Sequence, residues 1–176
     1  MRIPERGFTF IEMAIGSAIA AVVSAASVLV IFQILRSNET NNDYVTSVRQ
    51  AENAGYWISH DIKMAQSVTT DNLTSPDFLA LAWTEWNDSG VPTYHNVLYF
   101  FEGLTDGIGT LKRSHTSSGG ISEQTLIARQ IYYNSANMSY TSRASSQGQV
   151  LTLKLTSLSD ERLESREYQI IRRINY

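Results

Sequence analysis

The chain has 176 residues, enough for one modest domain with a hydrophobic core of its own. Its 14 Lys and Arg against 17 Asp and Glu give a net charge of -3, so the composition gives no general reason to expect nucleic acid as a partner. Cysteine is absent, which excludes disulfides and thiolate metal sites.

The first predicted element is an apolar helix. From Met13 to Leu35 no residue is charged, and at about 1.5 Å per residue a helix of this length covers roughly 35 Å, enough for a bilayer's hydrocarbon core. Arg2 and Arg6 precede the helix, which favours a cytoplasmic N-terminus. The sequence therefore predicts one pass through the cytoplasmic membrane, with the rest of the chain outside the cytoplasm.

Two ordinary interpretations compete for this segment. A secretory signal peptide would use Ala18 to Ala20 as its cleavage site, but the apolar run continues to Leu35 and would remain on the product. A generic single-span anchor explains the length and orientation. It leaves Glu12 unexplained, because an ionised carboxylate is costly in hydrocarbon.

The residues around this acid carry a family resemblance. Gly7 to Glu12 read "GFTFIE", follow a short charged leader and open the apolar helix, an arrangement that resembles the N-terminus of type IV pilins and pseudopilins. In that family a membrane-embedded prepilin peptidase cuts after the glycine and methylates the new N-terminal residue. The resemblance implies cleavage between Gly7 and Phe8, which would make Glu12 the fifth residue of the mature chain.

Glu12 then has two possible partners. The amino group that cleavage creates on Phe8 of a neighbouring subunit would pair with the carboxylate and favour docking over isolation in lipid. The alternative is an interaction with the positive end of its own helix. Phe8 and Glu12 are the predicted subunit-assembly residues, and Gly7 and Phe8 the predicted processing residues.

The helix is predicted to continue beyond the membrane, although the Asn-rich stretch 36–43 weakens helix propensity. Apolar or small residues then recur at steps of three and four, and polar residues, His60 and Asp61 among them, are assigned to the other faces. One helix from Phe8 to about Gln66 would be roughly 90 Å long. The recurring residues are Tyr44, Val48, Ala51, Gly55, Ile58, Ile62 and Ala65.

From Ser67 the apolar period changes to that of strands. Short strands are expected at 78–83, 96–101, 110–115, 150–156 and 168–174, with a charged turn at 160–167. The strand 150–156 is the clearest, because Leu alternates with Thr and Lys. The predicted fold class is α+β, a long N-terminal helix packed on an antiparallel sheet. The domains are a leader (1–7), a membrane helix (8–36), its amphipathic continuation (37–66) and a β-rich head (67–176).

The order of these elements sharpens the resemblance. The strand "VLYFFEG", the step "TLKRSH", the segment "LIARQIYYNSANMSY" and the terminal "YQIIRRIN" look like the minor pseudopilin J of type II secretion and the minor pilin W of type IV pili. The resemblance implies a subunit of the initiating or tip complex. Each of these motifs is loose, and the order covers nearly the whole chain.

No convergent set of catalytic groups is visible. His60 adjoins the helical stripe, while His95 and His115 are interpreted as turn residues beside strands. No zinc-protease, nucleophile-elbow, dinucleotide or phosphate-loop motif is present. Asp88 and Asp106 could offer oxygen ligands, but both stand in turn sequences, so no metal site is predicted. Without catalytic motifs, the sequence also predicts no enzyme activity and no cofactor.

The predicted function is that of a minor pilin or pseudopilin in a type IV pilus or type II secretion-like filament. Expected partners are other minor and major pilins, prepilin peptidase, a membrane assembly platform and, before assembly, the lipid bilayer. The protein would leave the cytoplasmic membrane for a cell-surface or periplasmic filament. The alternatives are a major pilin and a single-span protein with an extracytoplasmic ligand-binding domain.

Overall fold

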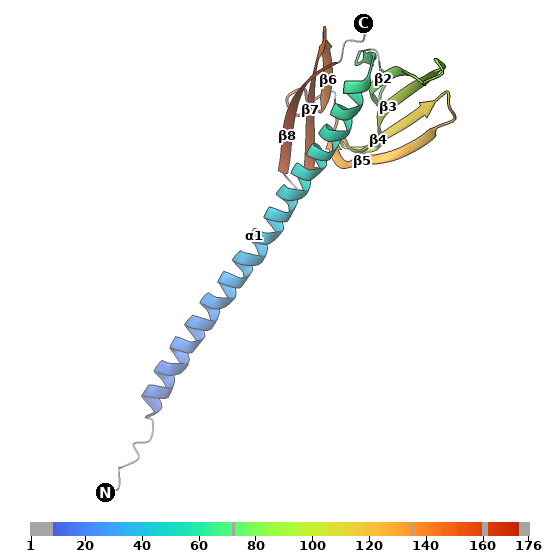
Figure 1. Ribbon diagram of the computed structural model, residues 1–176. Helices are drawn as coiled ribbons and strands as arrows, with labels where there is room; N and C mark the ends of the chain where they lie inside the picture. The colour runs from blue at the N-terminus through green and yellow to red at the C-terminus, as the bar shows by residue number, and fades with distance from the viewer. Residues whose placement is uncertain (1–8, 72, 135, 160–161, 173–176) are drawn as a thin grey trace. The chain divides into compact units, whose positions relative to one another are not determined.

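The computed structural model describes residues 9–71, 73–134, 136–159 and 162–172 (Figure 1). In these ranges one helix precedes eight strands. The elements are α1 (Phe10–Met64), β1 (Ser67–Thr69), β2 (Asp77–Trp86), β3 (Pro92–Thr105), β4 (Ile108–Ser117), β5 (Ser122–Tyr132), β6 (Arg143–Gln147), β7 (Val150–Ser159) and β8 (Arg162–Ile171).

The helix is continuous, and the predicted α+β class is confirmed. It passes through the Asn-rich stretch, where the Thr40 hydroxyl donates a hydrogen bond to the Arg36 carbonyl at 3.0 Å. The chain nevertheless divides into two compact units, residues 1–42 and 43–176. Each unit contains part of α1.

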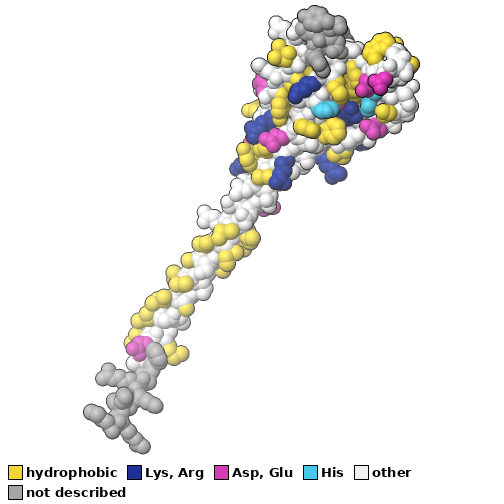
Figure 2. Space-filling view, viewed as in Figure 1, with side chains coloured by type: hydrophobic (Ala, Val, Ile, Leu, Met, Phe, Trp, Pro, Cys, Tyr) yellow, Lys and Arg dark blue, Asp and Glu magenta, His cyan; other side chains and the backbone are white. Residues whose placement is uncertain are grey.

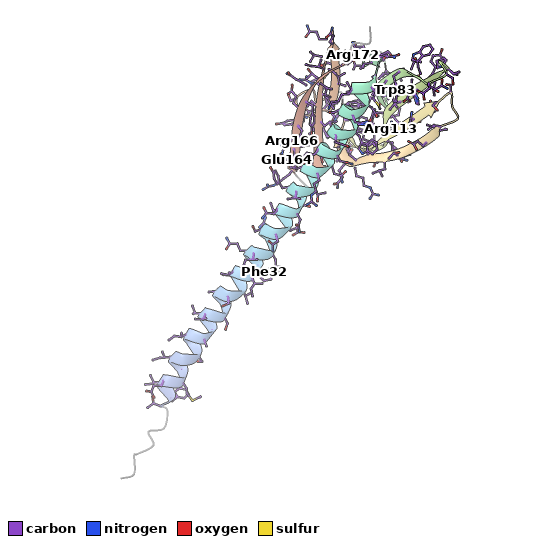
Figure 3. All side chains as sticks on the ribbon, in the orientation of Figure 1. Phe32, Trp83, Arg113, Glu164, Arg166 and Arg172 are labelled. Atoms are coloured by element: carbon purple, nitrogen blue, oxygen red, sulfur yellow. The ribbon has the colours of Figure 1, made fainter. Side chains whose placement is uncertain are left out.

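In the first unit the helix exposes all its side chains from Phe10 to Glu39. Figure 2 shows hydrophobic side chains along its surface, and Figure 3 shows Phe32 projecting from the ribbon. By length and composition, α1 is the one helix in the described part of the chain that is able to cross a membrane. Helices short of side-chain partners are unstable in water, so this surface requires a partner from outside the unit.

In the second unit α1 packs on the sheet through the predicted stripe. Ala51, Ile58 and Ile62 are fully buried, whereas Tyr44 at the start of the stripe is exposed. The assignment of Asp61 to a solvent face was wrong, because its side chain is also buried. Asp61 lies three residues after Ile58, so the helical period turns it toward the sheet.

All strand pairs are antiparallel, in the order β1-β2-β3-β4-β5-β7-β6, with β8 on the other edge of β7. The pairing between β5 and β7 is brief, with Ile131 opposite Ser157. Figure 1 shows the last turns of α1 between β2–β5 and β6–β8. There α1 completes the hydrogen bonding of β5: Gln50 accepts from the Arg129 amide (2.8 Å) and Asn53 donates to the Ile127 carbonyl (2.5 Å).

The core lies between α1 and the inner faces of the strands. The predicted alternation in β7 is confirmed, since Leu151, Leu153 and Leu155 are fully buried. One glycine sets the closest approach of helix and sheet: a Cβ on Gly55 would lie 2.3 Å from the ring of Tyr168 in β8. The other large, fully buried side chains are Tyr99, Phe101, Ile58, Ile62, Leu79, Leu111, Ile127, Ile131 and Val97.

The predicted strands are present but longer than expected. The charged turn at 160–167 is wrong in its second part, because β8 begins at Arg162. In an edge strand, charged residues alternate toward solvent without ending the strand, which a pattern based on apolar residues overlooks. Residues 160–161 and the predicted strand end at 173–174 lie outside the described residues.

Candidate functional site

The start of α1 is closed by a reciprocal hydrogen-bonded pair. The backbone amide and the hydroxyl of Thr9 both donate to Oε2 of Glu12, at 2.9 and 3.0 Å. The Glu12 amide donates to Oγ1 of Thr9 at 3.3 Å. This is a capping box, in which two side chains satisfy amide groups that the first helical turn leaves unpaired.

Within the described chain, Glu12 therefore interacts with its own helix end, one of the two partners that the sequence left open. Both capping residues are exposed, so the carboxylate is accessible to a group outside the chain. Gly7 and Phe8 lie outside the described residues. Pairing of Glu12 with the amine of a neighbouring subunit accordingly stays a prediction.

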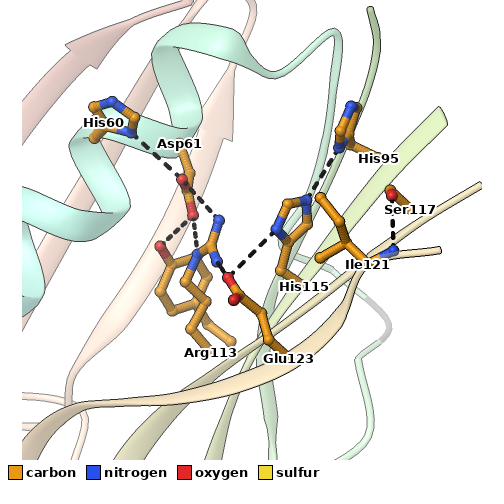
Figure 4. Close-up of polar contacts among 9 residues, drawn as sticks. His60, Asp61, His95, Arg113, His115, Ser117, Ile121 and Glu123 are labelled. Carbon is orange, nitrogen blue, oxygen red and sulfur yellow. Dashed lines mark hydrogen bonds and ion pairs between the residues drawn. The ribbon is translucent and has the colours of Figure 1, made fainter. Parts of the chain in front are cut away.

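A second polar cluster is buried between α1, β3 and β4. Arg113 donates to the Asp61 carboxylate through Nε (2.7 Å to Oδ2) and Nη2 (3.2 Å to Oδ1), and the Tyr99 hydroxyl donates to Oδ2 at 2.6 Å (Figure 4). Figure 3 shows Arg113 beside the last turns of α1. Trp57 covers the guanidinium, with its ring centroid 5.7 Å from Cζ. The acid is thus charge-paired and hydrogen-bonded, as burial requires.

The surroundings of Tyr99 and Arg113 hold both side chains in their protonated forms. Burial and the neighbouring Asp61 carboxylate raise the pKa of Tyr99 far above its usual value, so the phenol remains a donor. Burial alone would lower the pKa of Arg113, but hydrogen bonds and charge from Asp61 outweigh burial and raise it. A permanent cation, a phenol and a carboxylate held this way anchor the helix to the sheet.

The two strand histidines form a pair, and their assignment to turns was wrong. His95 lies in β3 and His115 in β4, with Nδ1 of His95 3.1 Å from Nε2 of His115. Trp83 stacks on both rings, at centroid distances of 5.1 and 5.7 Å. Register places His95 opposite Trp83 on one side and His115 beside Glu123 on the other, which sequence spacing alone does not reveal.

Each histidine also faces a carboxylate. Nε2 of His95 is 3.3 Å from Glu85. Nδ1 of His115 is 3.7 Å from Glu123, which also approaches Arg113 at 3.5 Å (Figure 4). Between the two rings, only one of the pair Nδ1 of His95 and Nε2 of His115 can carry a proton, because the other must accept the hydrogen bond. Burial, then the charges of Arg113 and His95, lower the pKa of His115. In the described part of the chain, no group of three or more His, Asp and Glu is arranged to hold a metal ion.

The family comparison concerns the N-terminal site. The model of the prokaryotic N-terminal methylation motif matches residues 3–28, which contain the capping box and the first turns of α1. The chain carries a prepilin-type N-terminal methylation motif. This motif supports a type IV pilin or pseudopilin that prepilin peptidase processes and that assembles with other pilins. Comparison with curated proteins and with solved structures gives no match.

The methylation motif and the apolar helix together indicate a membrane-anchored protein. The motif ends within the first unit and does not reach the sheet. The sequence identified Glu12 but overlooked Thr9 as its partner, although a Thr three residues before a Glu is a recognisable capping signal. It overlooked Arg113 and Tyr99 because Asp61 contacts them across the fold.

Proposed function

We propose that the protein is a minor pilin or pseudopilin, a non-catalytic subunit of a type IV pilus or type II secretion-like filament. The observation that carries the proposal is a methylation motif that opens an uninterrupted helix whose apolar side chains are all exposed from Phe10 to Leu35. A helix with this surface is suited first to lipid and then to a bundle of like helices.

Glu12 would fix the axial position at which two such helices dock. In lipid the capping box partly satisfies the carboxylate, while a neighbouring subunit supplies a full positive charge once the leader is removed. The pairing favours a subunit docked at a set axial position over one sliding freely along the apolar surface. We assign Phe8 and Glu12 this assembly role and Gly7 and Phe8 the processing role.

The minor role, in an initiating or tip complex, rests on the sequence resemblance of the second unit to pseudopilin J and pilin W described above. Expected partners are other minor pilins, the major pilin and the membrane assembly platform. The second unit would lie outside the cytoplasm before and after extraction from the membrane.

Quantitative mass spectrometry of purified filaments tests the role. The proposal predicts the protein in filaments at a small fraction of the main subunit, and loss of filament initiation when its gene is deleted. Abundance equal to the main subunit would indicate a major pilin. Absence from filaments and retention in the membrane would indicate a single-span ligand-binding protein.

A further inference from the structure

The face of strands β1–β4 that points away from α1 is unusual in its side chains. Register aligns two rows across these strands, and strand alternation places both rows opposite the buried core residues. The first row is Ser67, Ala82, Asn96 and Thr116, and the second is Thr69, Ala80, Leu98 and Ser114. We call these eight residues the hydroxyl face.

The hydroxyl face carries no charge. Solvated sheet faces usually present charged side chains, and depletion of charge is a feature of binding surfaces. Beyond the second row the next position on β4 is Lys112, which is paired with Glu102 at 2.6 Å. The uncharged area therefore ends at Lys112 on β4.

The same residues line a hollow. A depression of about 440 Å³ lies over the two rows, within the range of small-ligand sites. A second depression of about 150 Å³ adjoins it, shares Ser67, Ala82 and Asn96, and extends to Tyr94. The floor is low because Ala80 and Ala82 occupy the middle of β2. We call these two adjoining depressions, which share three lining residues, the groove.

Two exposed aromatic side chains lie on the same face: Tyr94 lines the smaller depression, and Trp86 is its diagonal neighbour on β2. Trp86 is 65% exposed and Tyr94 is 56% exposed. Thr84 pairs with Tyr94 and Trp86 with Pro92, so the two rings lie diagonally across β2 and β3 on the side of the hydroxyl face. Exposed rings beside a groove offer flat apolar surfaces to a ligand that has apolar faces of its own.

The groove chemistry selects among ligand classes. Nucleic acids and anionic polymers require a run of cations, which the hydroxyl face lacks. The centre of a protein interface is apolar, whereas here Leu98 is the one large apolar residue of the eight. Sugars match better, since their hydroxyls bond to Ser, Thr and Asn side chains and their CH faces stack on aromatic rings.

We propose that the hydroxyl face, with Trp86 and Tyr94, binds a neutral polysaccharide. The hydroxyls and the Asn96 amide hold the chain in the groove, and the two rings hold a sugar beside it. This property is independent of the filament role, because a single-span protein with the same second unit would bind equally.

Affinity electrophoresis of the full chain in detergent tests the proposal. The gels contain hydroxyethyl cellulose, galactomannan or dextran as neutral probes, or alginate or double-stranded DNA as anionic probes. We expect retardation by at least one neutral polymer and none by alginate or DNA. Trp86→Ala combined with Tyr94→Ala should weaken binding roughly tenfold or more. Tyr56→Ala is the matched control, since Tyr56 is exposed (67%) on α1, away from this face.

A second variant, Ala82→Lys, places a long charged side chain in the groove and should also weaken binding. Thermal unfolding of each variant shows whether the second unit is intact. Four results would overturn the proposal. The first three are no retardation by any neutral polymer, equal retardation by the anionic probes, and wild-type binding in variants that remain folded. The fourth is capture of a protein partner through Trp86 and Tyr94 without glycan binding.

Discussion

The two units share one helix, but its side chains are exposed in the first unit and partly buried in the second. From Phe10 to Glu39 every side chain of α1 is exposed, although this is the most apolar stretch of the chain. From Ser47 to Ile62 a stripe of α1 is buried by the sheet. The second unit thus has a core of its own, while the apolar surface of the first unit is left for lipid or other subunits.

The acids Glu12 and Asp61, one in each unit, differ in burial in the same way as the helix surface. Asp61 is buried and receives hydrogen bonds from Tyr99 and Arg113. Glu12 is exposed, and within the described chain its carboxylate accepts hydrogen bonds only from Thr9, three residues earlier. An acid whose partners come from the fold stabilises that fold, whereas an acid left at a helix end is available for assembly.

The strongest test of this difference is Glu12→Ala. Filament incorporation should fall by roughly a hundredfold, because the amine of the neighbouring subunit would then lie unpaired in an apolar bundle. Quantitative immunoblotting of purified filaments measures the change. Thr9→Val retains the carboxylate and should be incorporated near wild-type levels. Normal incorporation of Glu12→Ala would remove the assembly role of this acid.

Asp61→Ala, in contrast, should lower the stability of the second unit. Arg113 and Tyr99 would be left buried without their partner, at a cost of about 3–5 kcal/mol in the free energy of unfolding. Urea unfolding of the full chain in detergent, followed by tryptophan fluorescence, measures it. Asp61→Leu combined with Arg113→Met should lose less, since no buried charge is stranded. An Asp61→Ala chain within about 1 kcal/mol of wild type would contradict this role.

Two glycines of α1 offer a matched pair. A Cβ on Gly55 would collide with Tyr168, whereas one on Gly16 meets nothing within 4 Å. Gly55→Ala should destabilise the second unit by about 1 kcal/mol, after the gain in helix propensity is subtracted. Gly16→Ala should not destabilise it. Adding Tyr168→Leu should recover most of the Gly55→Ala loss, and equal behaviour of the two glycines would contradict the close packing.

The smallest expected effect is a pH dependence from His115. Its pKa is lowered in the fold, so the unfolded chain binds more protons as the pH falls through about 6.5, the ordinary histidine value. Stability should therefore be greatest above that pH and decline slightly as the pH falls toward the folded pKa. His115→Gln should flatten this slope, while His60→Gln, at an exposed position, should keep it. An unchanged slope in His115→Gln would exclude this origin.

Local pattern predicted the helix, its buried stripe and the alternation of β7, because each depends on neighbours within a few residues. It did not predict the Asp61 cluster, since Arg113 lies 52 residues away in sequence. The His95 and His115 pair likewise depends on the register of β3 with β4. At the N-terminal site, the Glu12 spacing was informative on its own, and the Thr9 cap was readable from the same four residues.

The central claim is that the N-terminal segment is a processing site followed by an assembly helix. Intact mass spectrometry of the protein from cells with active prepilin peptidase tests it most directly. We predict a chain that begins at Phe8, with a methyl group on its amine, and the unprocessed form in cells without the peptidase. A chain that still begins at Met1 in the presence of active peptidase would contradict the account.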